Sequence, residues 1–152
     1  MNASSRLRNW EISLLLALCV TMLAATWAQA AGAGLAADLV RLHVVAVSDD
    51  GAEQQVKLRV RDSVLAYLAP KMQNAKDAGE AADIISASIG GITDAAKAAA
   101  GPRAVTVTLS EEYYPTRQYQ GFALPAGKYR CLLVVQGAGE GHNWWCVVFS
   151  PL

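Results

Sequence analysis

The sequence has no excess of charge of either sign. Its 152 residues include 13 Lys and Arg and 13 Asp and Glu, so the formal net charge is zero. Proteins that bind nucleic acid through its phosphates carry a basic patch or stripe, and the sequence has no such concentration of Lys and Arg. Nucleic acid is therefore not expected as a partner.

Histidine and cysteine are also scarce. His43, His142, Cys131 and Cys146 have none of the spacings of a zinc-binding motif. No serine or cysteine lies in a recognised catalytic signature. The sequence thus predicts no metal, no cofactor and no catalytic residue, and it indicates that the protein is not an enzyme. The alternative is an extracytoplasmic hydrolase that uses His43 or His142.

One long hydrophobic run is present, at the N-terminus. Arg6 and Arg8 precede the apolar residues 12–27, and the small-x-small pattern Ala28-Gln29-Ala30 follows. This order is typical of a secretory signal peptide with cleavage after Ala30. The run is shorter than the roughly 20 residues of a membrane-spanning helix; an uncleaved membrane anchor is the alternative. In both cases the protein is exported across the cytoplasmic membrane.

These signals divide the chain into three parts. Residues 1–30 form the signal peptide or anchor, and residues 31–38, rich in Ala and Gly, are expected to be a flexible spacer. Residues 39–152 form one domain, which is large enough to bury a core without metals or many disulfides.

The first half of the domain predicts one strand and two helices. Residues 39–47 are apolar and β-branched, which is typical of a strand buried on both faces. Residues 53–68 have apolar residues at four-residue spacing and predict a helix that ends before Pro70. Residues 74–100 predict a second helix, with a kink or break at Gly90-Gly91. The stripe of the first helix consists of Val56, Val60, Val64 and Leu68.

The second half predicts three strands. They cover residues 104–109, 128–136 and 143–149, and a long aromatic-rich connection joins the first two. The glycine-rich residues 137–142 predict a hairpin between the last two strands. The expected fold class is α+β, with two amphipathic helices packed on a small, mostly antiparallel sheet.

Four blocks of the sequence resemble the stage II sporulation protein R family of endospore-forming bacteria. The last block is the most specific, because two adjacent tryptophans before a cysteine rarely occur by chance. The blocks are residues 41–49 (RLHVVAVSD), 57–65 (KLRVRDSVL), 114–119 (YPTRQY) with 124–129 (LPAGKY), and 139–149 (GEGHNWWCVVF).

The resemblance implies a signalling role. Members of this family are exported into the space between the forespore and mother-cell membranes. There they activate a membrane-embedded aspartic protease, which processes the pro-form of the mother-cell sigma factor. The chain departs from the family pattern at Val47, where Asn is usual, and at Ser150, where Pro is usual. It also ends at Leu152, where relatives commonly continue with another cysteine.

Protein contact is one expected use of the aromatic and arginine residues in the long connection. The alternative is that these aromatics cover the edge of the sheet and complete the core, since a protein this small needs its aromatic residues inside. Tyr114, Arg117 and Tyr119 lie in the long connection, and such side chains are enriched at interface hot spots. Trp144 and Trp145 must point to opposite faces of a strand. One tryptophan is expected to fill the core and the other to remain available to a partner. A module that binds cell-envelope glycan through its Trp and Tyr residues is a further alternative.

The pairing of Cys131 and Cys146 depends on the register of the expected hairpin. A turn at Ala138-Gly139 places the two cysteines directly opposite each other, where a disulfide can form. A turn at Gly139-Glu140 places them diagonally, with Cβ atoms roughly 7 Å apart, which is too far for a disulfide. The turn chemistry favours the second register, whereas the missing family cysteine favours a bridge to Cys131. Both alternatives stay open.

Overall fold

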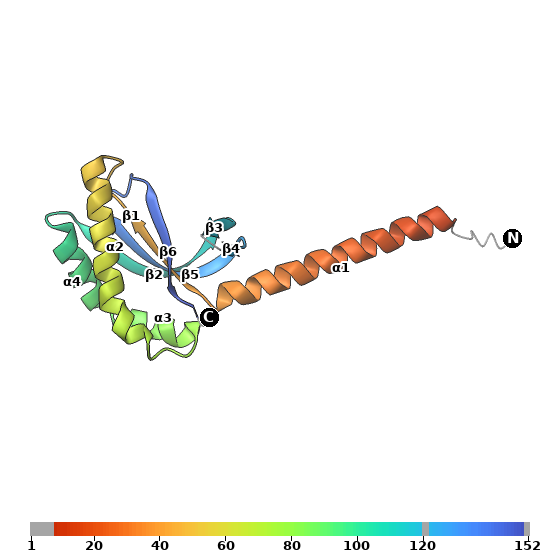
Figure 1. The fold of residues 1–152 in the computed structure, drawn as a ribbon, viewed down its shortest axis with the longest axis horizontal. Helices are drawn as coiled ribbons and strands as arrows, with labels where there is room; N and C mark the ends of the chain where they lie inside the picture. Colours follow the sequence, from red (N-terminus) through yellow and green to blue (C-terminus); the bar gives the residue numbers. More distant parts are fainter. Residues whose placement is uncertain (1–7, 120–121, 151–152) are drawn as a thin grey trace.

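A single strand, β1 (Val40–Val45), organises the fold, and all six of its side chains are buried. The structure is a computed structural model that describes residues 8–119 and 122–150. β1 lies inside a four-stranded sheet with the order β2-β5-β1-β6 (Figure 1). The other strands are β2 (Val105–Tyr114), β5 (Gly127–Gln136) and β6 (Asn143–Phe149). The apolar pattern of residues 39–47 therefore correctly predicted a doubly buried strand.

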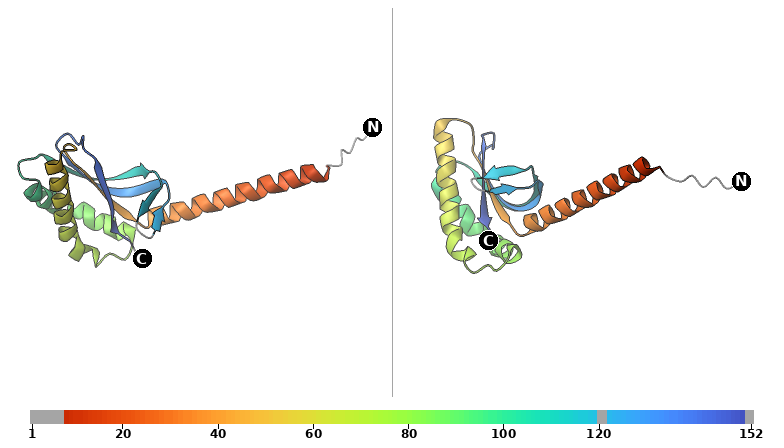
Figure 2. Two further views of the ribbon diagram at one scale, coloured as in Figure 1. Left: turned by 45° about the horizontal axis from the view of Figure 1, so that its top comes forward. Right: turned by 45° about the vertical axis from the view of Figure 1, so that its right-hand side comes forward.

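The sheet is mixed but mostly antiparallel. β1 runs parallel to β5 and antiparallel to β6, while β2 runs antiparallel to β5. Helices lie on one face of this sheet, as Figures 1 and 2 show. The predicted α+β class is confirmed.

Helix α2 (Gly51–Met72) packs on the sheet through the predicted apolar stripe. The prediction that it ends before Pro70 is wrong, because the helix continues to Met72. Pro70 lies in the last turn, where it removes one backbone hydrogen bond at an exposed position, so the helix tolerates it. The buried residues of the stripe are Val56, Val60, Val64 and Leu68.

The predicted second helix is divided into α3 (Ala78–Ala87) and α4 (Ile89–Ala100). The break lies at Ser88, before the two glycines that were expected to cause it. Gly91 serves the packing of helices instead. A Cβ atom there would overlap the ring of Tyr67 on α2, so the absence of a side chain lets α4 approach α2 closely.

The prediction of a hairpin between β5 and β6 is wrong, because the two strands are not neighbours in the sheet. Residues 137–142 pass over the end of β1, where Glu140 N–H donates to Val47 O at 3.3 Å and Gly141 N–H donates to Ala46 O at 3.1 Å. Gly137 and Gly139 adopt positive φ angles of 57° and 67°, which glycine adopts readily. This route places β6 next to β1 and leaves β1 between the two strands that were expected to pair.

A second, smaller core lies on the face of the sheet opposite helices α2–α4. β2 is longer than the predicted strand 104–109, and the connection after it contains a two-stranded sheet of β3 (Arg117–Tyr119) and β4 (Phe122–Leu124). The residues buried in this core are Ala36, Leu39, Tyr114, Leu124, Tyr129 and Cys131.

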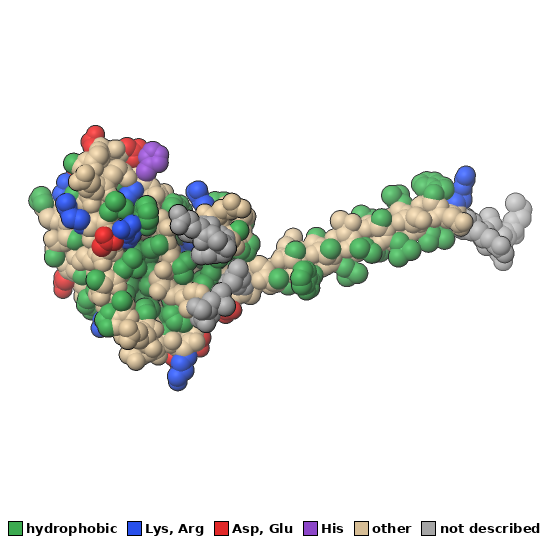
Figure 3. All heavy atoms as spheres, in the orientation of Figure 1, with side chains coloured by type: hydrophobic (Ala, Val, Ile, Leu, Met, Phe, Trp, Pro, Cys, Tyr) green, Lys and Arg blue, Asp and Glu red, His purple; other side chains and the backbone are tan. Residues whose placement is uncertain are grey.

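Helix α1 (Asn9–Ala37) includes most of the expected spacer. Residues 31–37 are thus helical, and Ala36 packs into the smaller core, so they are not an extended linker. The rest of α1 projects away from the domain (Figure 1), and apolar side chains lie along its length (Figure 3). Its segment Asn9–Gly32 has a mean hydropathy of 1.8, is 0% buried and is long enough to cross a membrane. A signal sequence meets the same criteria.

One partly buried ion pair joins the start of α2 to the segment between α4 and β2. Arg103 donates two hydrogen bonds to Glu53, at 2.7 and 2.6 Å, and these hold the pKa of the Glu53 carboxyl below its usual value. A carboxyl with a lowered folded-state pKa stabilises the protein above its unfolded pKa of about 4.3. This contribution is lost as the pH falls through the lower, folded value.

We predict that Glu53→Gln lowers the free energy of unfolding at neutral pH, and that its difference from the wild type shrinks in acid. Urea unfolding between pH 7 and pH 3 measures this difference. Glu111→Gln is the matched control, because Glu111 is exposed. A Glu53→Gln difference that stays constant over the whole pH range would contradict the assignment.

Candidate functional site

The face of the sheet opposite helices α2–α4 gathers aromatic, basic and acidic side chains from all four strands. Each strand contributes alternate residues to this face, as the two-residue period of a strand requires. We call the following five residues the aromatic cluster: Arg41, His43, Tyr114, Tyr129 and Trp145.

Trp145 holds the cluster together from β6. It is the direct cross-strand partner of His43, and their rings stack with centroids 4.1 Å apart and planes 13° apart. Tyr114 meets the indole edge-on, at 4.7 Å and 85°. Such aromatic pairs contribute about 0.5–1.5 kcal/mol each beyond the area they bury.

Arg41 is buried among these rings, with an exposed fraction of 1%. Its guanidinium carbon lies 4.2 Å from the centroid of Tyr114 and 4.9 Å from that of Tyr129. A cation over an aromatic face is attracted by the negative charge density of the ring, and the attraction is stronger away from water. The two tyrosines therefore compensate part of the cost of burying this charge.

His43 is also buried, at 8% exposure. Burial lowers its pKa, and the Glu112 carboxylate, 4.0 Å from Nδ1, acts in the opposite direction. The nearby Asn143 side chain also acts to raise the pKa of His43. Neither ring nitrogen, however, has a partner within hydrogen-bond geometry among the described residues. With the burial effect dominant, the imidazole is neutral at neutral pH.

Cys131 lies beside His43 and contacts Tyr114, with 2.6 Å between Sγ and Oη. Burial raises the pKa of Cys131 and of Cys146 to about 11. Both are free thiols. Cys131 pairs with Arg41 and Cys146 with Leu42, so they lie on opposite faces of the sheet with β1 between them. A disulfide between them is excluded in this fold, and both hairpin registers considered from the sequence are wrong.

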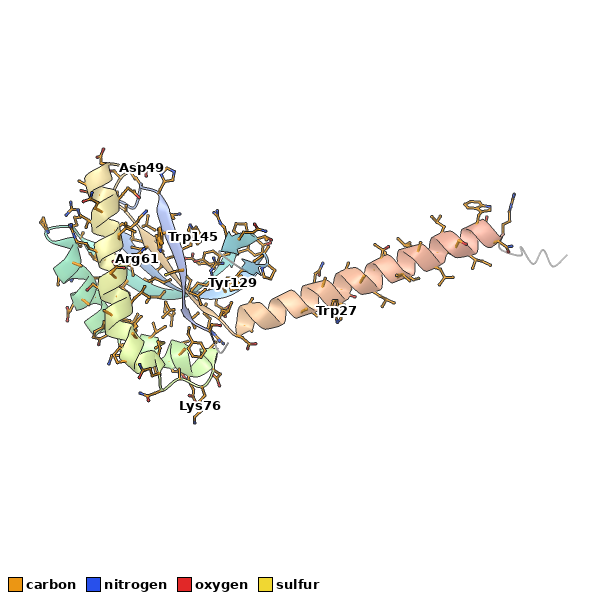
Figure 4. All side chains as sticks on the ribbon, in the orientation of Figure 1. Trp27, Asp49, Arg61, Lys76, Tyr129 and Trp145 are labelled. Carbon is orange, nitrogen blue, oxygen red and sulfur yellow. The ribbon has the colours of Figure 1, made fainter. Side chains whose placement is uncertain are left out.

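The two adjacent tryptophans do point to opposite faces, as predicted. Trp144 points toward the side of the helices but is not core. It is 38% exposed, with the guanidinium carbon of Arg61 on α2 4.7 Å from its ring centroid. Trp145, on the other face, is the better buried of the two; Figure 4 labels Trp145 on β6 and Arg61 on α2. Trp144 is partly exposed because β6 is an edge strand, which the helices do not cover fully.

A surface groove of about 310 Å³ adjoins β6 and contains three of the five predicted contact residues. Arg117 and Trp144 are exposed in it, and Arg117 lies 5.4 Å from the ring centroid of Trp145. Tyr114 is only 1% exposed, so it supports the groove from inside and is not itself available to a partner. The side chain of Tyr119 lies outside the described part of the structure. The groove is lined by Arg117, Gln118, Asn143, Trp144 and Trp145.

The glycine-rich loop before β6 is anchored to the end of β1. Asp49 accepts hydrogen bonds from the backbone N–H of His142 at 2.5 Å and from its Nδ1 at 2.6 Å, and these lower the pKa of Asp49. Lys57 Nζ donates to the carbonyl of His142 at 2.9 Å. A Cβ on Gly141 would overlap the carbonyl of Ser48, so this position accepts only glycine without a backbone shift. Asp49, labelled in Figure 4, thus fixes the entry of the chain into β6.

Glu112 and the grouping of His43 with Cys131 were missed by sequence reasoning. The ligand atoms of these three residues lie within 4.8 Å of one another, although they come from β2, β1 and β5. A search for closely spaced motifs cannot find them. The sequence does contain one indication of the site, the two-residue spacing of polar residues within a strand. Arg41 and His43 have this spacing in an otherwise apolar strand, and Glu112 and Tyr114 have it in β2.

Comparison with protein families matches residues 36–152 to the family described as stage II sporulation protein R. The chain is also similar to a curated protein, the stage II sporulation protein R of Bacillus subtilis (strain 168). The two are 32% identical over 117 residues, which cover 74% of this chain and 52% of that relative. The chain thus spans about half the length of the relative. No solved structure matches the chain significantly.

We predict that the two tryptophans differ in their effect on stability. Trp145→Ala removes the ring that joins His43 to Tyr114 and should lower the free energy of unfolding by about 2–4 kcal/mol. Trp144→Ala should cost about 1 kcal/mol or less, because its ring is partly solvated and makes a surface cation–π contact. Urea unfolding of both variants measures the difference. Equal losses at the two positions would contradict the arrangement of the cluster.

Proposed function

Because the chain belongs to the stage II sporulation protein R family, we propose that it is an exported sporulation signalling protein. It activates a membrane-embedded aspartic protease of the mother cell by protein contact, and that protease processes the pro-form of the mother-cell sigma factor. The observation that carries the proposal is the family match, which covers residues 36–152 and with them every strand and helices α2–α4.

The N-terminal helix supports the export part of the proposal, whereas the destination, the space between the forespore and mother-cell membranes, rests on the family membership. Its outer part is apolar and exposed, as a signal sequence or an anchor requires. Cleavage after Ala30 would leave Ala36 and Leu39 on the domain, where both are buried in the smaller core. The folded domain therefore keeps its packing whether the helix is removed or stays in the membrane.

The groove beside β6 is the proposed contact surface for the protease. It presents Trp144 and Arg117, residue types that dominate interface hot spots. Within the described residues β6 pairs with β1 alone, so its outer edge offers backbone groups to an added strand. Trp145 and Tyr114 support the groove from within the aromatic cluster, which makes the exposed side chains a preorganised surface.

A hydrolytic role is less well supported by the two histidines. Cys131 is fully buried and its pKa is raised, so it is a poor nucleophile beside His43. His142 is held against the Asp49 carboxylate through its backbone N–H and Nδ1, and it anchors a loop. The exposed residues therefore favour contact with a partner protein over catalysis.

We predict that Trp144→Ala and Arg117→Ala are exported normally but fail to support processing of the sigma factor. Loss of one hot-spot side chain lowers affinity about tenfold or more. The variants are expressed in the sporulating host in place of the wild type. Immunoblots then measure both the exported protein and the ratio of processed to unprocessed sigma factor.

Two exposed residues outside the groove are matched controls: Tyr113→Ala for the tryptophan and Arg59→Ala for the arginine. Both should process the sigma factor normally. Processing that continues after complete deletion of the gene would overturn the proposed function. Retention of the wild-type protein on purified peptidoglycan, lost in Trp144→Ala, would instead indicate a glycan-binding module.

A further inference from the structure

Three potential metal ligands meet on the face of the sheet opposite helices α2–α4. They are an imidazole nitrogen of His43, a carboxylate oxygen of Glu112 and the sulfur of Cys131, all within 4.8 Å of one another. Three points so close together lie within about 2.8 Å of a common centre, and zinc–ligand bonds are about 2.0–2.3 Å. Small rotations of the side chains would therefore complete such bonds.

The histidine provides an independent indication of a ligand. His43 is more than nine-tenths buried, and neither of its ring nitrogens has a hydrogen-bond partner among the described residues. A buried polar atom without a partner costs about 1–3 kcal/mol. Nδ1 lies 4.0 Å from the Glu112 carboxylate, a separation too long for a direct hydrogen bond. A rotation of either side chain would bring the two atoms to the roughly 3.3 Å that separates two ligands of a tetrahedral zinc ion.

Tyr114 provides the surrounding hydrogen bonds that metal ligands commonly have. Its hydroxyl lies 2.6 Å from the sulfur of Cys131 and 3.3 Å from a carboxylate oxygen of Glu112. Ser110 donates to the other carboxylate oxygen at 3.3 Å. Such second-shell contacts orient the ligands and raise the affinity for the metal.

The chemistry of the donor set favours zinc over harder cations. Magnesium and calcium prefer oxygen ligands alone, whereas a thiolate, an imidazole and a carboxylate together suit a tetrahedral zinc ion. The Glu112 carboxylate and a Cys131 thiolate would provide two negative charges against the single positive charge of nearby Arg41. The side chain of Glu112 is 35% exposed and provides the route by which an ion would enter.

We propose that His43, Glu112 and Cys131 form a zinc site with three protein ligands that links β1, β2 and β5. The fourth position is open to water or to the Tyr114 hydroxyl. Zinc binding replaces the thiol proton of Cys131, which is released to solvent, and no electron transfer is involved. The site is separate from the proposed contact with the protease, because none of its three ligands lines the groove beside β6.

The test uses the full chain in detergent micelles, titrated with Co²⁺ as a spectroscopic substitute for zinc. We expect one equivalent of Co²⁺ to bind, with a thiolate-to-cobalt charge-transfer band that Zn²⁺ abolishes by displacement. Cys131→Ser should remove the band, and Glu112→Gln should lower the affinity at least about tenfold. Glu112→Gln is the safer variant for folding, because it keeps the shape of a partly exposed side chain.

Four matched variants control for adventitious binding. Cys146→Ser and Cys19→Ser remove the other thiols, while His142→Ala and Glu111→Gln remove the exposed counterparts of His43 and Glu112. All four should bind Co²⁺ as the wild type does. Circular dichroism verifies that each variant is folded.

Absence of a stoichiometric cobalt band in the wild type would overturn the proposal. So would a band that survives in folded Cys131→Ser, or one lost in His142→Ala. Sigma-factor processing by the Arg117 and Trp144 variants is a separate measurement, so failure of the zinc site leaves the proposed function testable by itself.

Discussion

The rest of the structure depends on the burial of β1 between β5 and β6. A strand with neighbours on both edges and cores on both faces has no access to solvent, and all six residues of β1 are buried. One face presents Val40, Leu42 and Val44 to helices α2–α4. The other face must then bury Arg41 and His43, which are polar. The aromatic cluster is the means by which the fold accommodates them.

This constraint connects segments that lie far apart in the sequence. Asp49 and Lys57 hold the loop that delivers β6 to β1, and β6 in turn brings Trp145 onto His43. Tyr114, at the end of β2, closes the cluster against Arg41. The four sequence blocks that resemble the sporulation family are therefore one spatial unit. The exposed groove beside β6 is its outer surface.

Local pattern predicted much of the fold but not its strand order. The stripe of α2, the burial of β1 and the extent of β6 follow from periodicity, which short segments carry by themselves. Which strand lies beside which depends on long-range packing, and the glycine-rich residues 137–142 resemble a hairpin turn. A strand buried on both faces is usually central, so the composition of residues 39–47 predicted an inner position for β1 but not which strands lie beside it.

The site was predicted only in part, for a related reason. Trp144, Trp145 and Arg117 were identified by residue type, whereas Tyr114, for which both partner contact and the core were considered, is buried. Burial of a tyrosine at the end of a strand depends on what lies across the sheet. Glu112 was not predicted from the sequence, because the residues close to it, His43 and Cys131, belong to two other strands. When a site is formed by residues from several strands, the sequence shows only the two-residue spacing of polar residues within each strand.

Nuclear magnetic resonance tests the placement of β1 most directly. The account predicts nuclear Overhauser contacts between the rings of His43 and Trp145, and between the backbones of β1 and β6. It also predicts ring-current shifts of the His43 protons. These shifts should become smaller in Trp145→Phe, because a phenyl ring produces a weaker ring current than an indole. Direct backbone contacts between β5 and β6, with none between β1 and β6, would contradict the account.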